Sequence, residues 1–252
     1  MDIEMVEIVD GAGVIDVRGD SGVYGIDSQN LLYLGGVAAA IDMADLRGSI
    51  SRLFVRAPDR VPRPEQLQAL RVLTVSGHSS GALAETLRPL LALMANGRYE
   101  LRPPIPVTNR ISEGFQAWSG SGPDRWGVSC PGPDEPDWTY PEEEWLTPTE
   151  AWPPADTATV DRYREVIRQG ERPVVITLRA GAENYWSGFV LDGHHKLAAY
   201  RAEEVAPVVL RIARADPPPI TAAQIRWHFP RAAEHWRLQW VMAALDRREG
   251  ES

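Results

Sequence analysis

The stretch Val190-Leu-Asp-Gly-His-His-Lys-Leu-Ala-Ala199 carries the strongest structural signal in this chain. Apolar residues lead into Asp-Gly and a helix-forming run follows at once, which predicts a strand that turns directly into a helix. The first amide groups of such a helix have no partner within it, and the helix dipole favours an anion there. Gly193 lets the backbone and a ligand approach closely. The stretch therefore predicts an anion site at this turn.

The side chains of the turn suit phosphate chemistry. His194, His195 and Lys196 add donors for phosphate oxygens. Asp192 is expected to hold Mg²⁺, directly or through water. A plain Asp-Gly turn, in which Asp192 only caps the helix, remains an alternative. A two-histidine metal site is disfavoured, because adjacent positions do not place both rings on one metal.

Lysine is rare in this sequence. Lys196 is the only lysine among 26 basic residues, and all the others are arginine. A lone lysine beside two histidines points to a chemical role, with chance as the competing explanation.

The elements around the turn form a regular series. The pattern predicts a helix, two strands, the turn with its helix, and a third strand. A helix capped by Thr157 or Thr159 and ended by Gly170 opens the series, and two further helices follow Pro217-Pro-Pro219. The predicted ranges are 160–168, 173–178, 185–191, 195–202, 207–212, 221–227 and 234–245.

The segment from about Thr147 to Ala213 resembles the ParB/sulfiredoxin-type nucleotide-binding domain. The resemblance covers about a quarter of the chain and rests on the first helix, the strand pair and Leu191-Asp-Gly-His-His-Lys-Leu-Ala-Ala-Tyr200. The Asp-Gly-His-His-basic form is most similar to the free L-serine kinases of this fold. Lys196 stands where the family commonly has arginine, and lysine meets a phosphate as a point charge without a bidentate fork.

The resemblance implies a nucleotide-dependent phosphotransferase for a small hydroxyl-bearing metabolite, using ATP or ADP (CTP is a further candidate) with Mg²⁺. Glu150, in Pro148-Thr-Glu150, matches the glutamate that activates the hydroxyl in these kinases. Asp192 would organise the metal, and the residues from Gly193 to Lys196 would cradle the phosphates. A catalytically silent nucleotide sensor or protein-interaction module is the alternative function, and a solvated loop acid is the alternative for Glu150. Sulfiredoxin activity is not expected, because His194 stands where that enzyme has its cysteine.

Residues 1–140 match nothing that we can name. Short alternating runs over 3–40 predict a small antiparallel sheet. Strands are predicted at 50–55 and 70–75, and a helix at 80–94 with a kink or break at Pro89. The strand spacing is compatible with a leucine-rich-type repeat or an ordinary α/β layer. We therefore expect an α+β protein with a β-rich mixed part, 1–140, and a ParB/sulfiredoxin-like part with C-terminal helices, 141–252.

Five of the nine tryptophans fall within 103–155: Trp118, Trp126, Trp138, Trp145 and Trp152. We expect them to pack this acidic segment onto its neighbours, with ligand stacking as the alternative. The single cysteine, Cys130, cannot form an intramolecular disulfide.

Charge and hydropathy narrow the range of partners. The net charge is −9, which argues against a nucleic-acid partner. The acidic excess lies in the first 154 residues, so a protein partner would contact residues 1–140. No apolar run is long enough to cross a bilayer and the N-terminus is acidic, so we expect no membrane partner and a cytoplasmic location.

Overall fold

The structure is a computed structural model. It describes residues 3–20, 28–45, 51–56, 82–107, 127–128, 137–139, 145–150, 152–181, 187–234 and 238–251. The predicted strand at 70–75 and Cys130 lie outside these residues. The described part is an α+β fold, as expected, with a mixed sheet and helices packed against it.

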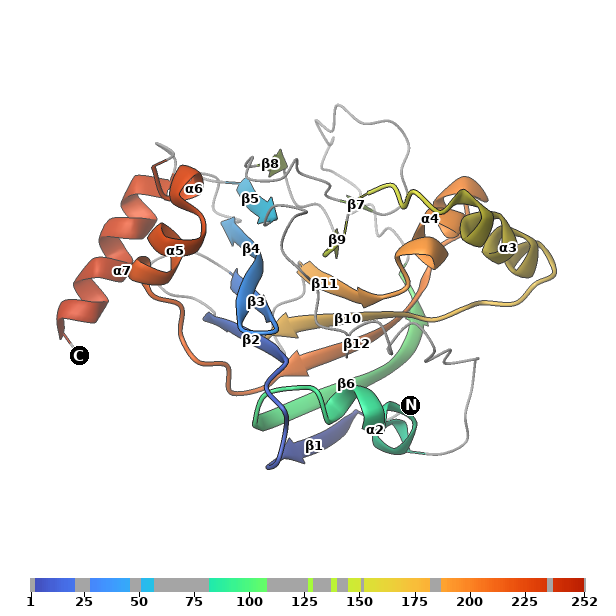
Figure 1. Ribbon diagram of the computed structural model, residues 1–252, viewed down its shortest axis with the longest axis horizontal. Coiled ribbons are helices and arrows are strands. Elements are labelled where there is room, and N and C mark those ends of the chain that lie inside the picture. Colours follow the sequence, from blue (N-terminus) through green and yellow to red (C-terminus); the bar gives the residue numbers. More distant parts are fainter. Residues whose placement is uncertain are drawn as a thin grey trace, which may run out of the picture.

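The larger sheet, sheet A, has seven strands in the order β1-β6-β12-β10-β11-β9-β7. β10 and β12 run parallel, β9 and β11 run parallel, and β10 and β11 are antiparallel. In Figure 1, β6 and β1 of this sheet lie below sheet B, and its other strands lie to the right of sheet B. Its strands are β1 (Glu4–Ile8), β6 (Gly97–Pro106), β7 (Gly127–Val128), β9 (Trp145–Pro148), β10 (Val175–Ala180), β11 (Ser187–Asp192) and β12 (Val208–Arg214).

The smaller sheet, sheet B, is antiparallel and has the order β2-β3-β4-β5-β8. The predicted antiparallel sheet in 3–40 is therefore present in β2 to β4, but β1 leaves it and pairs with β6 in sheet A. The strands are β2 (Ile15–Asp20), β3 (Ser28–Leu34), β4 (Val37–Asp45), β5 (Ser51–Arg56) and β8 (Asp137–Thr139).

Alternation along the strands of sheet A builds two cores on its two faces. Ile176 and Leu178 of β10 join the core that sheet A shares with β2 to β4, and helix α2 (Leu83–Leu91) belongs to the same core. Val175, the residue before Ile176, joins a core on the opposite face with α3 (Thr157–Arg168) and α4 (His194–Ala202). The two helices thus cover the end of sheet A where β11 runs into α4 (Figure 1).

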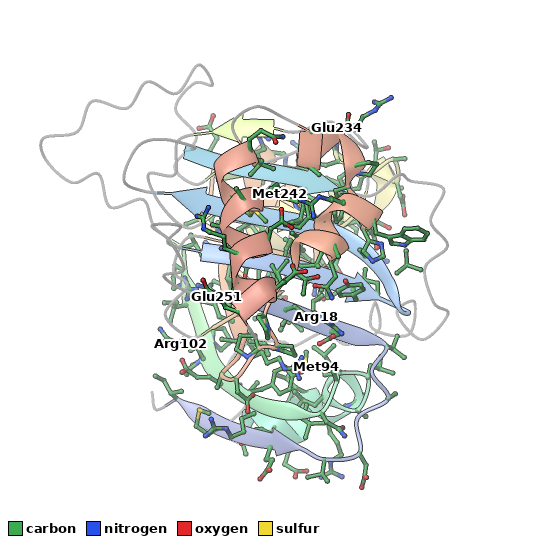
Figure 2. The ribbon with its side chains drawn as sticks, turned by 90° about the vertical axis from the view of Figure 1, so that its left-hand side faces the viewer. Arg18, Met94, Arg102, Glu234, Met242 and Glu251 are labelled. Carbon is green, nitrogen blue, oxygen red and sulfur yellow. The ribbon has the colours of Figure 1, made fainter. Side chains whose placement is uncertain are left out.

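The C-terminal helices cover the outer face of sheet B, as Figure 2 shows from that side. Leu31, Ile41 and Met43 of sheet B share a core with apolar residues of these helices. The helices are α5 (Ala222–His228), α6 (Pro230–Glu234) and α7 (Gln239–Glu251). The layers therefore run from α3 and α4 through sheet A and sheet B to α5–α7.

Helix boundaries follow local signals. Asp156, rather than Thr157 or Thr159, caps α3, because its side chain accepts from the backbone N–H of Thr159 at 3.1 Å. Gly170 follows the end of that helix with φ 91°. α2 contains Pro89 and ends at Leu91, so the helix is shorter than predicted.

Strands from both sides of residue 140 share sheet A. β6 pairs with β12, from Tyr99 opposite Arg214 to Pro106 opposite Val208. The core between the sheets likewise takes residues from both stretches, such as Leu101 and Ile212. Residues 1–140 and 141–252 therefore pack into one continuous structure within the described part of the chain.

Two buried polar contacts join the sheets. The side-chain oxygen of Asn30 on β3 accepts from the backbone N–H of Ala180 on β10 at 2.8 Å. Arg214, at the end of β12, donates to the carbonyl of Val17 on β2 at 3.3 Å and pairs with Asp16. Such contacts fix how the two sheets are aligned. If the sheets slid past one another, a buried donor would lose its partner, which costs free energy.

Asn30→Ala should lower the free energy of unfolding by about 1–3 kcal/mol, because it leaves the buried N–H of Ala180 without this acceptor. The measurement is urea unfolding followed by circular dichroism. Val37→Ala is the control, since Val37 is 40% exposed on the neighbouring strand and its truncation should change little. Equal midpoints for the wild type and Asn30→Ala would contradict the assigned role.

Candidate functional site

The sheet topology brings the predicted site residues to one edge. β9 and β11 are parallel neighbours with Pro148 opposite Val190, so both strands end at the same edge of sheet A. Glu150 follows β9, and Asp192 is the last residue of β11. These two carboxylates, 42 positions apart in the sequence, therefore meet at the start of α4, and Glu150 lies close enough to influence the pKa of Asp192.

The turn between β11 and α4 depends on glycine. Gly193 has φ 105°, a left-handed conformation that favours glycine. A Cβ at this position would lie 3.2 Å from the Cα of Val175 and 3.3 Å from Cδ of Lys196. The helical ladder begins directly after the turn, where the N–H of Leu197 donates to the carbonyl of Gly193 at 2.8 Å. The predicted strand–Gly–helix geometry is present.

Lys196 points into the protein. It is 3% exposed, and its Nζ donates to Oδ2 of Asp192 at 2.7 Å and to the carbonyl of Val174 at 3.0 Å. Nζ also lies 6.0 Å from the ring centroid of Tyr163 on α3, within the range of a cation–π contact. The only lysine of the chain thus ties α4 to β11, to the residue before β10 and to α3.

Burial raises the pKa of Asp192, which is 9% exposed. The charge of Lys196 and its hydrogen bond oppose this shift, as does the backbone hydrogen bond from Gly193, whereas the nearby charge of Glu150 adds to it. Asp192 therefore depends on Lys196 for the stability of its ionised form.

His194, the first residue of α4, is held in one tautomer by Thr149, the residue that follows β9. Its Nε2 accepts from the backbone N–H of Thr149 at 3.0 Å, and an N–H group can only donate. The proton of the neutral ring therefore sits on Nδ1, which lies 3.9 Å from Oε2 of Glu150. The hydroxyl of Thr149 donates to the carbonyl of Val190 at 2.7 Å and completes the link between β9 and β11.

Within each pair of like residues, the two histidines and the two carboxylates, one side chain is more exposed to solvent than the other. His194 is 4% exposed, whereas His195 is partly exposed. His195 lies near Asp156, the cap of α3, and its charge contributes to lowering the pKa of Asp156 after the larger effect of the Thr159 hydrogen bonds. The Glu150 side chain is 24% exposed, against 10% for Asp192. Glu150 and His195 are therefore the site side chains most accessible to a ligand.

The structure thus brings Glu150, Asp192, Gly193, His194 and Lys196 together and places His195 on the side of α3. It adds Thr149, Tyr163 and the carbonyl of Val174, which sequence reasoning did not single out. Thr149 lies inside the quoted Pro-Thr-Glu motif. Its contact with His194 depends on the pairing of β9 with β11, which the sequence alone does not show.

The described residues contain no group of three or more His, Cys, Asp or Glu side chains that could hold a metal ion. Asp192, the predicted magnesium ligand, has Oδ2 paired with Lys196. The chain's own residues therefore do not fit a dedicated magnesium centre at this turn. Within the same described part, no helix combines the length and apolar character that crossing a bilayer requires.

Gly193→Ala should destabilise the protein by about 1–3 kcal/mol, because alanine must adopt a left-handed conformation and its Cβ crowds Val175. Gly170→Ala is a matched control, since Gly170 has φ 91° with no atom within 4 Å of the added Cβ. Urea unfolding of both variants separates crowding from backbone strain. Equal losses would show that the contact with Val175 is unimportant.

Lys196→Met should cost about 3–5 kcal/mol near pH 8, because it leaves the Asp192 carboxylate buried without its cation. The folded-state pKa of Asp192 is already above its ordinary value of 3.8 and should rise further in this variant. An acid with a raised folded pKa contributes stability at low pH that is lost as the pH rises through the folded pKa.

The loss in Lys196→Met should therefore be smaller near pH 5 than near pH 8. The double variant Asp192→Asn with Lys196→Met should recover much of the loss at high pH, because no charge is then buried. Urea unfolding at both pH values measures this. A pH-independent loss that the second substitution does not relieve would argue against a buried ion pair.

Comparison with known proteins gives no match among protein-family models, curated proteins or solved structures.

Proposed function

We propose that the start of α4 binds the phosphates of a nucleotide, and that the protein transfers a phosphoryl group to the hydroxyl of a small metabolite. The observation that carries the proposal is the meeting of Glu150 with the Gly193 turn. Two parallel strands end side by side there and bring a partly exposed carboxylate to a helix N-terminus. The resemblance to the ParB/sulfiredoxin-type domain adds the nucleotide, ATP or ADP with CTP as a further candidate.

The phosphates would be bound by backbone N–H groups of α4 and by the side chain of His195. The first turn of α4 offers N–H groups and the positive end of the helix dipole, both of which favour an anion. His195 is partly exposed and able to donate to a phosphate oxygen. Lys196 would act as a positioning residue, because its Nζ holds Asp192 and Val174 beneath the turn.

Glu150 would accept the proton of the acceptor hydroxyl. In the proposed step the hydroxyl oxygen forms a bond to the terminal phosphorus as the bond to the bridging oxygen breaks. The proton passes to the carboxylate of Glu150, and the nucleotide leaves with one phosphate fewer. The Nδ1–H of His194, facing Oε2 at 3.9 Å, would orient Glu150 for this role.

Mg²⁺ would arrive with the nucleotide rather than occupy a site built by the chain. Nucleotide-bound Mg²⁺ commonly keeps several waters and takes one or two protein carboxylates. We assign no step to the ion, because Asp192 is paired with Lys196.

One observation favours the alternative of a silent nucleotide sensor. Phosphoryl transfer usually needs cations beside the transferred group, and the ammonium of Lys196 is turned away from the mouth of the turn. A sensor would bind the same phosphates at the same helix start without transferring them.

The Glu150→Gln variant separates the two functions. Binding is measured by calorimetry with ATP, ADP, CTP and GTP, with and without Mg²⁺, and transfer is measured with radiolabelled nucleotide and an acceptor panel that starts with L-serine. If Glu150 is the base, Glu150→Gln should bind nucleotide as the wild type does and lose about 100-fold or more of its turnover.

Glu171→Gln, an exposed glutamate outside the site, is the matched control and should behave as the wild type. Nucleotide binding without transfer to any acceptor would support the sensor. If no nucleotide binds the wild type, the phosphate site itself is rejected.

A further inference from the structure

Strand β1 lies at one edge of sheet A. It pairs with β6 on one side, and it is the outermost strand at that edge among those the structure describes. Both views show it at the bottom of the molecule (Figures 1 and 2). An edge strand presents N–H and C=O groups that can pair with another chain.

The face of β1 that points away from the core is exposed and, apart from Glu7, apolar. Val6 and Ile8 pack toward the core between the sheets. Their neighbours in the alternation are exposed, with Ile3 at 52%, Met5 at 55% and Val9 at 66%. Three of the six large exposed hydrophobic residues in the described part of the chain therefore fall on β1 or next to it.

β1 is short, at five residues, but otherwise carries few of the features that normally protect a sheet edge. β6 carries Pro103, Pro104 and Pro106 where it runs past β1, and proline cannot donate to another strand. β1 has no proline. Glu4 is turned to α2, where its Oε2 accepts from the N–H of Leu83 at 2.8 Å. Glu7 is then the one charged residue on the exposed face of β1.

We propose that β1 pairs with β1 of a second copy of this chain, antiparallel and about a two-fold axis at Val6. In an antiparallel pair, directly opposite residues lie on the same face, so exposed positions must meet exposed positions. With Val6 opposite Val6 of the partner, Ile3 lies opposite the partner's Val9. The exposed apolar residues at the ends of each strand then cover one another.

Charge and overlap together favour this register over its two neighbours. With Val6 on the axis, Glu7 lies opposite Met5 of the second copy, and Glu4 lies opposite Ile8. A shift by two residues in one direction places Glu7 opposite Glu7, and like charges directly opposite are destabilising. A shift by two in the other direction shortens the overlap to residues 3–7 and places Ile3 opposite Glu7.

Sedimentation velocity of the full chain from about 1 to 200 µM tests the pairing, because a weak dimer dissociates within this range. The wild type should change from monomer to dimer with concentration. Ile3→Arg with Val9→Arg places arginine opposite arginine at both ends of the paired strands and should weaken the dimer by about tenfold or more. Both positions are exposed, so thermal melting should show an intact fold.

Ile3→Glu with Val9→Arg is the register-specific control. It places opposite charges across the same pairs and should restore the dimer, with a dissociation constant that rises with salt. Trp227→Arg, at the most exposed apolar residue in the described part of the chain (82%), should leave the dimer unchanged. The proposal is overturned by a wild type that stays monomeric, by dissociation in Trp227→Arg, or by equal behaviour of the two double variants.

Discussion

The buried pair between Lys196 and Asp192 is the interaction on which the candidate site depends. Asp192 closes β11, and Lys196 is the third residue of α4, so their contact at 2.7 Å fixes the angle at which the helix leaves the sheet. The same ammonium donates to the carbonyl of Val174, immediately before β10. A compact ammonium on a flexible stem can meet a carboxylate and a carbonyl in a narrow space, whereas the planar fork of arginine requires a wider one. This gives a physical reason for one lysine in a chain that otherwise uses arginine.

The pair also changes the positive charge that the turn can offer to an anion. From the sequence, Lys196 counts as positive charge for a phosphate. In the structure its charge is balanced by Asp192, and the partly exposed side chains beside the start of α4 are those of His195 and Glu150. Attraction for an anion would then come from the helix dipole and N–H groups more than from a side-chain cation. Such a site would discriminate by shape and hydrogen bonding, which would suit a defined phosphate better than a general polyanion.

Local signals predicted the elements well where they are strong. The helix at 157–168, the strand–Gly–helix turn at 187–202 and the strand at 208–214 all lie where periodicity, Gly170 and Gly193 indicate. Pairing between distant strands was not predictable in this way. Nothing in the alternation of residues 4–8 distinguishes a partner in sheet B from β6 in sheet A, because either sheet buries Val6 and Ile8. In the site, too, local motifs were predictive and contacts between distant segments were not. Glu150 came from a motif, but the contact of Thr149 with His194 needs the register of β9 on β11.

The two proposals concern different parts of the same sheet, namely the edge strand β1 and the carboxyl ends of β9 and β11. β1 and β11 are separated by β6, β12 and β10, which at the usual spacing of strands is about 20 Å. Pairing through β1 would therefore extend sheet A away from Glu150 and the Gly193 turn, and each copy would keep an open site. Because no described residue near β1 takes part in the site contacts, an effect of dimerisation on ligand binding would have to pass through the strands of sheet A. β10 is the strand best placed to carry such an effect, since Val174 immediately before it accepts from Lys196 and Ala180 at its far end bonds Asn30 of sheet B.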